Sequence, residues 1–280
     1  MEIQWFPGHM AKTLRQIKEN IRLVDFVIEL LDARIPQSSS NPELERIIPP
    51  GKRIIALNKS DLADPTITIR WIDYYKDKSV PAFAIDSIKG DGISELVAGV
   101  SDLGADTKEK WQRRGRKQKP IRVMIAGIPN VGKSSLINRI AKKSAAKTGG
   151  RPGVTRGRQW IKLTGQIDLL DTPGVLWHKF QSRTEGINLA LTGAVKEEIL
   201  DSEELAVHLV DRLKECCKPV LAEYYDVPNS NGDSYDVLQQ IGSARGCLLR
   251  GGKTDTKRAS VILLNDYRSG RLGRISLESP

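Results

Sequence analysis

The chain has 280 residues, of which 39% are hydrophobic and 28% charged, and its formal net charge is +10. This composition is typical of globular proteins and excludes the collagenous, disulfide-rich and intrinsically disordered classes. No apolar run approaches the roughly 18 residues that a bilayer span requires, and residues 1–7 contain no basic segment followed by an apolar one. We therefore expect a cytoplasmic protein without a membrane partner.

Basic residues are spread unevenly along the chain. Residues 108–119 hold seven Lys or Arg against one acidic residue, and residues 139–158 hold seven with no acidic residue. Such clusters favour a polyanionic partner such as nucleic acid, while an ordinary solvated basic face is the alternative. The cysteines, Cys216, Cys217 and Cys247, have neither a metal-ligand spacing nor an even number, so we expect reduced thiols.

Helical and strand patterns alternate through the first part of the chain. Apolar residues recur at helical spacing over residues 10–21, 67–77, 92–100 and 134–141. Apolar runs typical of strands cover residues 26–31, 53–57, 80–85, 121–126, 159–163 and 167–170. This alternation predicts an α/β fold with crossover connections and a mostly parallel sheet.

Two stretches show neither pattern. Residues 106–120 are polar and basic, which predicts an exposed linker, and residues 142–158 are rich in glycine, which predicts a mobile loop. Beyond the last strand, helical patterns alone continue to the end. We therefore predict two domains: residues 1–181, which include an N-terminal arm (1–22) and the linker, and a smaller all-helical domain over residues 182–280.

The strongest chemical signal follows the strand predicted at residues 121–126. Residues 127–134 read Gly-Ile-Pro-Asn-Val-Gly-Lys-Ser, the G-x-x-x-x-G-K-S pattern of a phosphate-binding loop between a strand and a helix. The glycines let successive N–H groups surround the phosphates, Lys133 can reach the β- and γ-phosphates, and the Ser134 hydroxyl can bind Mg²⁺. The residues predicted to contact the phosphates are Asn130, Val131, Gly132, Lys133, Ser134 and Ser135.

A phosphate loop does not select a base, but the Asn-Lys-Ser-Asp sequence at residues 58–61 is a candidate selector. A carboxylate at Asp61 can accept hydrogen bonds from both N1–H and the N2 amine of guanine, whereas adenine offers no such pair of donors. Guanine is therefore favoured by roughly 10⁴-fold. Asn58 is expected to brace the loop and Lys59 to lie over the base. The residues predicted to form this half of the nucleotide site are Asn58, Lys59, Ser60 and Asp61.

Three further segments complete the predicted site. Asp86 and Ser87 end the strand predicted at 80–85 and could contact the base from its other edge, although this match is loose. Residues 171–174 read Asp-Thr-Pro-Gly, a D-x-x-G switch in which Asp171 binds Mg²⁺ through water and the Gly174 N–H senses the γ-phosphate. Thr155 is the candidate to complete the Mg²⁺ shell with Ser134, and an ordinary turn threonine is the alternative.

These motifs stand in an unusual order, because the base selector precedes the phosphate loop and the switches. The same sheet can still form if the chain is circularly permuted, with the old termini joined through residues 106–120. The second switch then leads directly into the helical C-terminal region, so the nucleotide state could move that region.

With these motifs, the chain resembles the bacterial circularly permuted GTPases of the YlqF type, the ribosome biogenesis GTPase A family. The resemblance extends over the full length, from Trp-Phe-Pro-Gly-His-Met at 5–10 and Asp-Ala-Arg-Ile-Pro at 32–36 to Arg-Ser-Gly-Arg-Leu-Gly at 268–273. It implies a P-loop GTPase domain that hydrolyses GTP to GDP with Mg²⁺ during late assembly of the large (50S) ribosomal subunit. It also implies binding to ribosomal RNA or the subunit precursor in the GTP state, release after hydrolysis, a low intrinsic rate stimulated by the ribosome, and a monomer off the ribosome.

The group that orients the hydrolytic water is not evident, because Val175 follows the Asp-Thr-Pro-Gly switch where many small GTPases have glutamine. His9 on the N-terminal arm is the first candidate and His178 the second; a cap or an RNA contact is the alternative for His9. Lys133 and Thr155 complete the predicted catalytic set. In related GTPases an asparagine at the position of Asn130 coordinates K⁺, although it could simply stabilise the turn.

Two other classes of function remain open at this stage. One is a GTP-dependent RNA-binding scaffold whose slow hydrolysis only resets it. The other is an ATP-dependent enzyme that uses the same phosphate loop, which the Asp61 carboxylate argues against.

Overall fold

The computed structural model describes residues 9–113, 119–148, 160–163, 167–170, 182–195, 201–228 and 230–280. The strands in these segments are β1 (Phe26–Asp32), β2 (Arg53–Asn58), β3 (Ala82–Ala84), β4 (Ile121–Gly127), β5 (Trp160–Leu163) and β6 (Ile167–Leu170). The helices are α1 (His9–Ile21), α2 (Pro36–Ser39), α3 (Pro42–Ile47), α4 (Pro65–Asp77), α5 (Ile93–Arg113), α6 (Lys133–Thr148), α7 (Arg183–Leu191), α8 (Ser202–Cys216), α9 (Lys218–Tyr225), α10 (Ser234–Ala244) and α11 (Thr256–Arg268).

The described strands form one sheet in the order β3-β2-β1-β4-β6-β5. Neighbouring strands are parallel except at the edge, where β5 runs antiparallel to β6, so the predicted mostly parallel α/β sheet is confirmed. The chain proceeds outward from β1 through β2 to β3 and then crosses to β4 on the other side of β1. Open sheets of this kind bind ligands beyond the carboxyl ends of the strands where the order reverses. The topology therefore places a site at the ends of β1 and β4.

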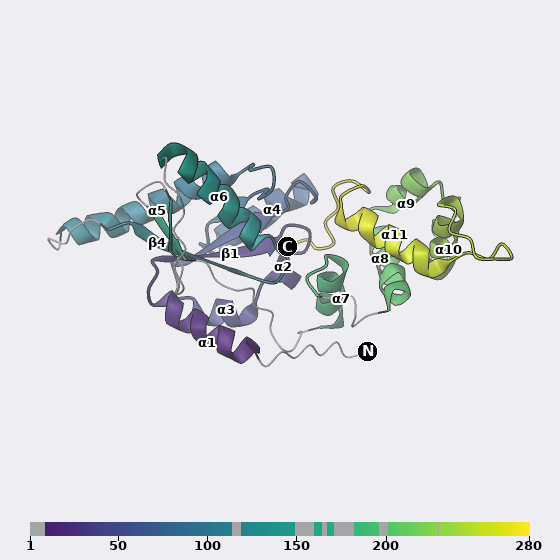
Figure 1. Cartoon of the computed structure of the whole chain (residues 1–280), viewed down its shortest axis with the longest axis horizontal. Coiled ribbons are helices and arrows are strands. Elements are labelled where there is room, and N and C mark those ends of the chain that lie inside the picture. The colour runs from purple at the N-terminus through teal and green to yellow at the C-terminus, as the bar shows by residue number, and fades with distance from the viewer. Residues whose placement is uncertain are drawn as a thin grey trace.

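Helices cover both faces of the sheet (Figure 1). On one face, Leu136 of α6 and residues of α5 pack with Ile125 of β4 in the main hydrophobic core. On the opposite face, Ile17 of α1 and Leu44 of α3 pack with Met124. Successive side chains of β4 point to opposite faces of the sheet. Both faces are apolar, so helices must cover both.

Two helices are longer than the sequence patterns predict. α5 continues to Arg113, so the first half of the expected linker at residues 106–120 is helical. α6 continues to Thr148, so the expected loop at 142–158 begins later. In both places the chain has good helix formers such as Ala, Lys, Glu and Gln and no glycine or proline, and intrinsic propensity carries the helix beyond the apolar stripe.

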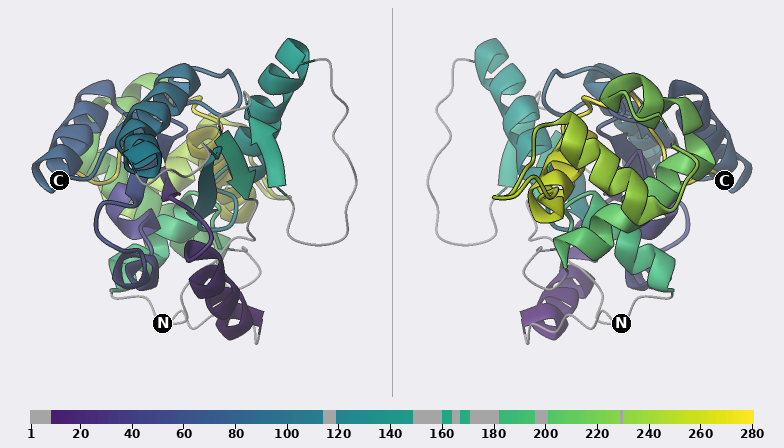
Figure 2. Two further views of the ribbon diagram at one scale, coloured as in Figure 1. Left: turned by 90° about the vertical axis from the view of Figure 1, so that its left-hand side faces the viewer. Right: turned by 90° about the vertical axis from the view of Figure 1, so that its right-hand side faces the viewer.

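The C-terminal helices α8 to α11 form a bundle beside the sheet, and Figure 2 shows this bundle from its outer side. α7 lies between the sheet and the bundle and contacts both α2 and α8. Arg268, at the end of α11, donates hydrogen bonds to the carbonyls of Leu191 and Ala190 at the end of α7, at 2.9 and 2.8 Å. After α11 the chain returns to the sheet, and its C-terminus lies near α2 (Figure 1). The predicted division into residues 1–181 and 182–280 stays a prediction.

Candidate functional site

The predicted phosphate loop connects β4 to α6, at the point where the sheet topology places a site. Gly132 has a φ of +103°, and a Cβ at this position would lie 2.3 Å from Nδ2 of Asn58. A side chain would therefore collide with a buried neighbour as well as strain the backbone, so glycine is required here. The absence of a side chain at Gly132 therefore lets the loop lie directly against Asn58 at the end of β2.

Lys133, the first residue of α6, is directed back into this loop. Its Nζ donates hydrogen bonds to the carbonyl oxygens of Gly127 at 3.1 Å and Ile128 at 2.6 Å, and the residue is 9% exposed. Ser134 and Ser135 follow in the first turn of α6 and are exposed. The loop thus joins a cation, hydroxyl groups and the N–H groups of a helix N-terminus, a combination suited to a phosphate chain.

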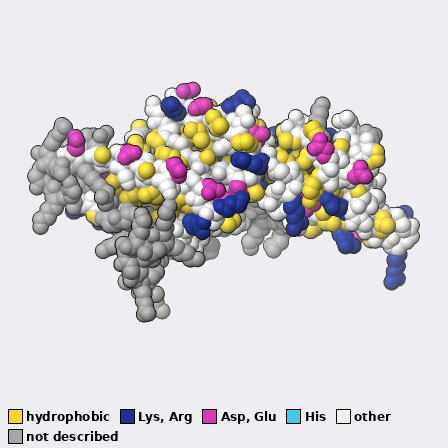
Figure 3. Space-filling model, turned by 90° about the horizontal axis from the view of Figure 1, so that it is seen from above, with side chains coloured by type: hydrophobic (Ala, Val, Ile, Leu, Met, Phe, Trp, Pro, Cys, Tyr) yellow, Lys and Arg dark blue, Asp and Glu magenta, His cyan; other side chains and the backbone are white. Residues whose placement is uncertain are grey.

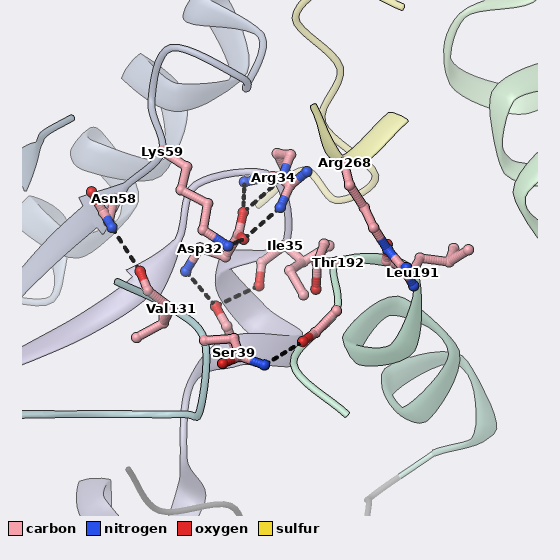
Figure 4. A network of polar contacts seen from close by, with 12 residues as sticks. Asp32, Arg34, Ile35, Ser39, Asn58, Lys59, Val131, Leu191, Thr192 and Arg268 are labelled. Carbon is pink, nitrogen blue, oxygen red and sulfur yellow. Dashed lines mark hydrogen bonds and ion pairs between the residues drawn. The ribbon is translucent and has the colours of Figure 1, made fainter. Parts of the chain in front are cut away.

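Asn58, at the end of β2, connects three parts of the predicted site. Its Nδ2 donates to the carbonyl oxygen of Val131 at 2.6 Å (Figure 4). Its Oδ1 accepts from the Ser87 N–H at 3.0 Å. Asn58 is 1% exposed, so this contact is protected from water. One side chain therefore joins the phosphate loop to the two segments predicted to bind the base.

Lys59 does not extend into solvent but binds Asp32 at the end of β1, with Nζ 2.9 Å from Oδ2 (Figure 4). Arg34 binds the same carboxylate through Nε at 2.9 Å and Nη2 at 2.8 Å, and the Arg34 guanidinium lies 5.2 Å from the ring centre of Tyr267 on α11. Burial raises the pKa of the Asp32 carboxyl, but the charges of Arg34 and Lys59 outweigh burial and hold this pKa well below its ordinary value. Asp32 therefore stays charged and fixes the ammonium group of Lys59.

Asp61 and Asp86 take different positions at the base side. Asp61 is partly exposed, and its Oδ2 lies 3.3 Å from Nζ of Lys89. Asp86 is buried, and its Oδ1 accepts from the N–H groups of Ile88 at 2.7 Å and Lys89 at 3.0 Å, which closes a tight turn after β3. Asp61 is therefore accessible to a ligand, whereas the described contacts of Asp86 are those of a turn.

Asn130 in the phosphate loop faces the C-terminal half of the chain. It has a left-handed backbone, with φ of 57°, and its Nδ2 donates to the carbonyl oxygen of Gly193 at 2.9 Å. Gly193 follows α7, so the phosphate loop is in direct contact with the segment that leads to the helical bundle.

Several predicted residues lie outside the described residues, namely Thr155, Asp171, Gly174 and His178. His9 begins α1, but its side chain is not among those described. Of the predicted Mg²⁺ ligands the structure thus places Ser134, whose hydroxyl is an oxygen donor of the kind that Mg²⁺ prefers, exposed beside the phosphate loop. A phosphate-bound Mg²⁺ fits this position, since such an ion takes few protein ligands.

The sequence motifs did not reveal two groups of residues at this site. Asp32 and Arg34 belong to one of the motifs that carry the family resemblance, yet they also fix Lys59. Their position at the end of a buried strand next to the reversal of strand order is the signal that identifies them. The second group is Arg274 and its neighbours, which contact the backbone of residues 60–64. Nothing in the local pattern of these last residues indicates that contact.

None of the described helices is long and apolar enough to cross a membrane. The described residues also contain no group of three or more His, Cys, Asp or Glu side chains arranged to hold a metal ion.

A family model and proteins of known name match this chain. A family model described as "50S ribosome-binding GTPase" matches residues 122–238, a stretch that begins in β4 and does not contain the base-selecting motif at residues 58–61. "Ribosome biogenesis GTPase A" of Priestia megaterium is 45% identical over 100% of this chain and 98% of its own length. The protein of the same name from Thermotoga maritima is 31% identical over 99% of this chain and 95% of its own length.

Solved structures agree with these sequence relatives. The GDP-bound structure of TM YlqF superimposes on this chain with a TM-score of 0.68 at 26% identity, covering 95% of this chain and 99% of the other. The crystal structure of GNP-bound YlqF from T. maritima gives a TM-score of 0.66 at 27% identity, covering 96% of this chain and 98% of the other. Both matches extend over the sheet and the helical bundle together.

Proposed function

The chain belongs to the ribosome biogenesis GTPase A family, and we propose on this basis that it is a GTP-hydrolysing switch in late assembly of the large ribosomal subunit. It binds the subunit precursor in the GTP state and leaves after hydrolysis to GDP. Its intrinsic rate is low and rises on the ribosome.

The observation that carries the nucleotide part of this proposal is the position of Asn58. It joins Val131 of the phosphate loop to Ser87, and it lies one residue before Lys59 and three before Asp61. Segments that are far apart in the sequence are thereby held together at the carboxyl ends of the strands, as binding of a single nucleoside triphosphate requires. Asp61 selects guanine through its carboxylate, which adenine could not satisfy.

In the proposed reaction the chain binds and orients the triphosphate. The loop N–H groups and Lys133 stabilise negative charge on the β- and γ-phosphates, and Ser134, Thr155 and Asp171 would hold Mg²⁺. An ion held by these residues would neutralise negative charge on the triphosphate. Gly174 senses the γ-phosphate. When hydrolysis removes the γ-phosphate, the segment that follows Gly174 is released.

We assign the orientation of the hydrolytic water to His9 on the N-terminal arm, because Val175 cannot do so. Substitution His9→Ala should lower ribosome-stimulated turnover by about 100-fold and leave GTP affinity unchanged. Single-turnover hydrolysis with purified large subunits, together with a separate measurement of GTP affinity, tests this assignment. Unchanged turnover would remove His9 from the reaction and direct attention to His178.

Ribosomal RNA is the proposed partner, and the C-terminal bundle is its main binding surface. Lys and Arg side chains lie on this bundle, including its outer tip, in the face drawn in Figure 3. The exposed basic residues at this end of the chain include Arg250, Lys253, Lys257 and Arg258. Such residues bind phosphate backbones without reading sequence. The protein acts in the cytoplasm as a monomer when it is off the ribosome.

Sucrose-gradient sedimentation of cell extract with GTP, GDP or a non-hydrolysable GTP analogue tests the switch. We expect the protein to travel with large-subunit particles in the presence of GTP analogue and to remain at the top of the gradient with GDP. Equal association in all three conditions would contradict a nucleotide switch.

The second candidate function, an RNA-binding scaffold with negligible catalysis, is favoured by the extent of basic surface outside the nucleotide site. Multiple-turnover GTP hydrolysis with purified large subunits separates the two functions. A switch gives many turnovers per protein molecule, whereas a scaffold gives at most one.

A further inference from the structure

The backbone of the base-selecting loop, residues 58–64, is held by the last residues of the chain. Arg274 donates from Nε to the carbonyl oxygen of Ala63 at 2.9 Å and from Nη2 to the carbonyl oxygen of Ser60 at 2.8 Å. The planar guanidinium thus joins two carbonyls of one loop, a geometry that suits arginine and that lysine cannot reproduce. Arg274 lies more than 200 positions beyond this loop in the sequence.

The residues that follow Arg274 extend this contact along the loop. The Ile275 N–H donates to the carbonyl oxygen of Leu62 at 2.9 Å, and the Ser276 hydroxyl accepts from the Asp64 N–H at 3.1 Å. Ile275 and Ser276 are each 3% exposed. Together with Arg274 they satisfy main-chain groups of the loop on both sides of Asp61. We call residues 274–278 the C-terminal strap.

The strap is itself fixed at its far end. The Leu277 N–H donates to the carbonyl oxygen of Arg34 at 2.9 Å. The Glu278 carboxylate accepts from the N–H of Gln37 at 2.8 Å and from Nδ2 of Asn188 at 2.9 Å. Gln37 belongs to α2 and Asn188 to α7, and Arg34 lies between β1 and α2. The strap is therefore fixed at both of its ends and can hold the loop in one position.

Asp61 has weak side-chain support of its own. Its described ion pair is with Lys89, whose side chain is 64% exposed, and exposed pairs contribute little to the position of a carboxylate. The orientation of the Asp61 side chain is consequently set by the backbone on either side of it. The strap binds this backbone at the carbonyls of Ser60 and Leu62.

We propose that the C-terminal strap is part of the guanine site and that Arg274 is a positioning residue for the Asp61 carboxylate. This inference rests on the proposed function, since it requires that Asp61 accepts hydrogen bonds from guanine. It adds a specificity-determining contact supplied by the segment that directly follows the helical bundle. A displacement of the bundle that pulled on the strap would weaken guanine binding, and bound guanine nucleotide would by the same linkage stabilise the strap.

The test compares binding of GDP with binding of inosine diphosphate, which lacks the exocyclic N2 amine and so makes one hydrogen bond fewer to Asp61. We expect Arg274→Ala to weaken GDP binding by about tenfold and inosine diphosphate binding by less, so that the ratio of the two affinities falls. Arg274→Lys should be intermediate, since one donor can reach one carbonyl. Equilibrium titration of the full chain in Mg²⁺ provides both dissociation constants.

Arg271→Ala is the matched control. Arg271 pairs with Asp266 at 3.0 Å within the helical bundle, so its removal should leave both affinities unchanged. Thermal unfolding of each variant without nucleotide shows whether the fold is intact, and Ser276→Ala offers a milder change should Arg274→Ala unfold.

An unchanged ratio of GDP to inosine diphosphate affinity in folded Arg274→Ala and Ser276→Ala would overturn the inference while leaving the proposed function in place. A wild-type chain that binds GDP no tighter than ADP would instead overturn the proposed function, and the inference with it.

Discussion

The two halves of the proposed nucleotide site are built in different ways. The phosphate half consists of consecutive residues, 127–135, that pass from β4 into α6. The base half combines residues 32–34, 58–64, 86–89 and 274–278, which are distant in the sequence. The first half depends on local backbone geometry, whereas the second depends on packing across the whole chain.

This difference explains how a permuted chain keeps its site. A local loop is unaffected by where the chain begins and ends, so the phosphate half needs no adjustment. The base half stands near the start of the permuted chain, and here the closing residues cover its backbone. Asn58 is the link between the halves, because it binds both Val131 and Ser87.

The largest effect is expected in the phosphate half. Substitution Lys133→Ala removes the cation directed into the loop, and GTP turnover should fall by about 1000-fold because charge on the transferred phosphoryl group loses its protein counter-charge. Phosphate release measured at saturating Mg²⁺ checks this, with Lys119→Ala, an exposed residue before β4, as the control. Turnover within a few-fold of wild type would show that the loop does not bind the reacting phosphate.

The next largest effect is expected in the free energy of unfolding, through an ion pair in the base half. Asp32→Asn removes the charge that pairs with both Arg34 and Lys59, and the free energy of unfolding should fall by about 3 kcal/mol because two cations, one fully buried, lose their partner. Urea unfolding at neutral pH measures this loss. Asp73→Asn, on the exposed side of α4, is the control.

The pH dependence of that loss has a defined sign. The pKa of Asp32 lies below its ordinary value in the folded state, so its contribution to stability is complete above about pH 4 and declines as the pH falls further. The difference between wild type and Asp32→Asn should therefore be constant from about pH 5 to 7 and shrink below about pH 4. A difference that grew on acidification would contradict the ion-pair account.

The selectivity of the base half provides the third test. Asp61→Asn should weaken GTP binding by about 100-fold and favour xanthosine triphosphate, whose base presents an oxygen where guanine presents the N2 amine. Competition among GTP, ATP and xanthosine triphosphate for binding to the wild type and the variant measures this change of base preference. Asp102→Asn, on α5, is the control and should behave as wild type. Loss of all binding without a change in preference would argue against Asp61 as the selector.

The smallest expected effect concerns the monovalent cation. If Asn130 coordinates K⁺ near the phosphates, hydrolysis in KCl should exceed hydrolysis in NaCl at equal ionic strength by about tenfold, since a positive charge near the phosphates stabilises the transition state. The Asn130→Ala variant should lose this difference. Equal rates in both salts would leave Asn130 with its observed contact to Gly193 alone.

The sequence predicted the sheet and the position of residues 127–135 between a strand and a helix well, because both follow from local rules. A G-x-x-x-x-G-K-S loop after an apolar strand fixes its own backbone, and the alternating patterns identified β1 and β4 to within a residue or two. The ends of α5 and α6 were missed because apolar periodicity stops before helix propensity does.

The rest of the base half was not predictable from the same rules. Residues 274–276 contact the base-selecting loop through its backbone carbonyl and N–H groups, which carry no sequence signature. Asp32 lies in a motif that could be recognised, but its pairing with Lys59 depends on β1 and β2 being neighbours in the sheet. Contacts between residues so distant in sequence become visible only once the strand order is known.

Hydrogen–deuterium exchange of the full chain with and without GDP tests most directly whether these scattered segments surround one nucleotide. We predict that a single equivalent of GDP slows exchange together in residues 58–64, 86–90, 127–135 and 274–278, with little change in α10. Protection confined to residues 127–135 would contradict the account, since the phosphate loop would then bind its ligand without the base half.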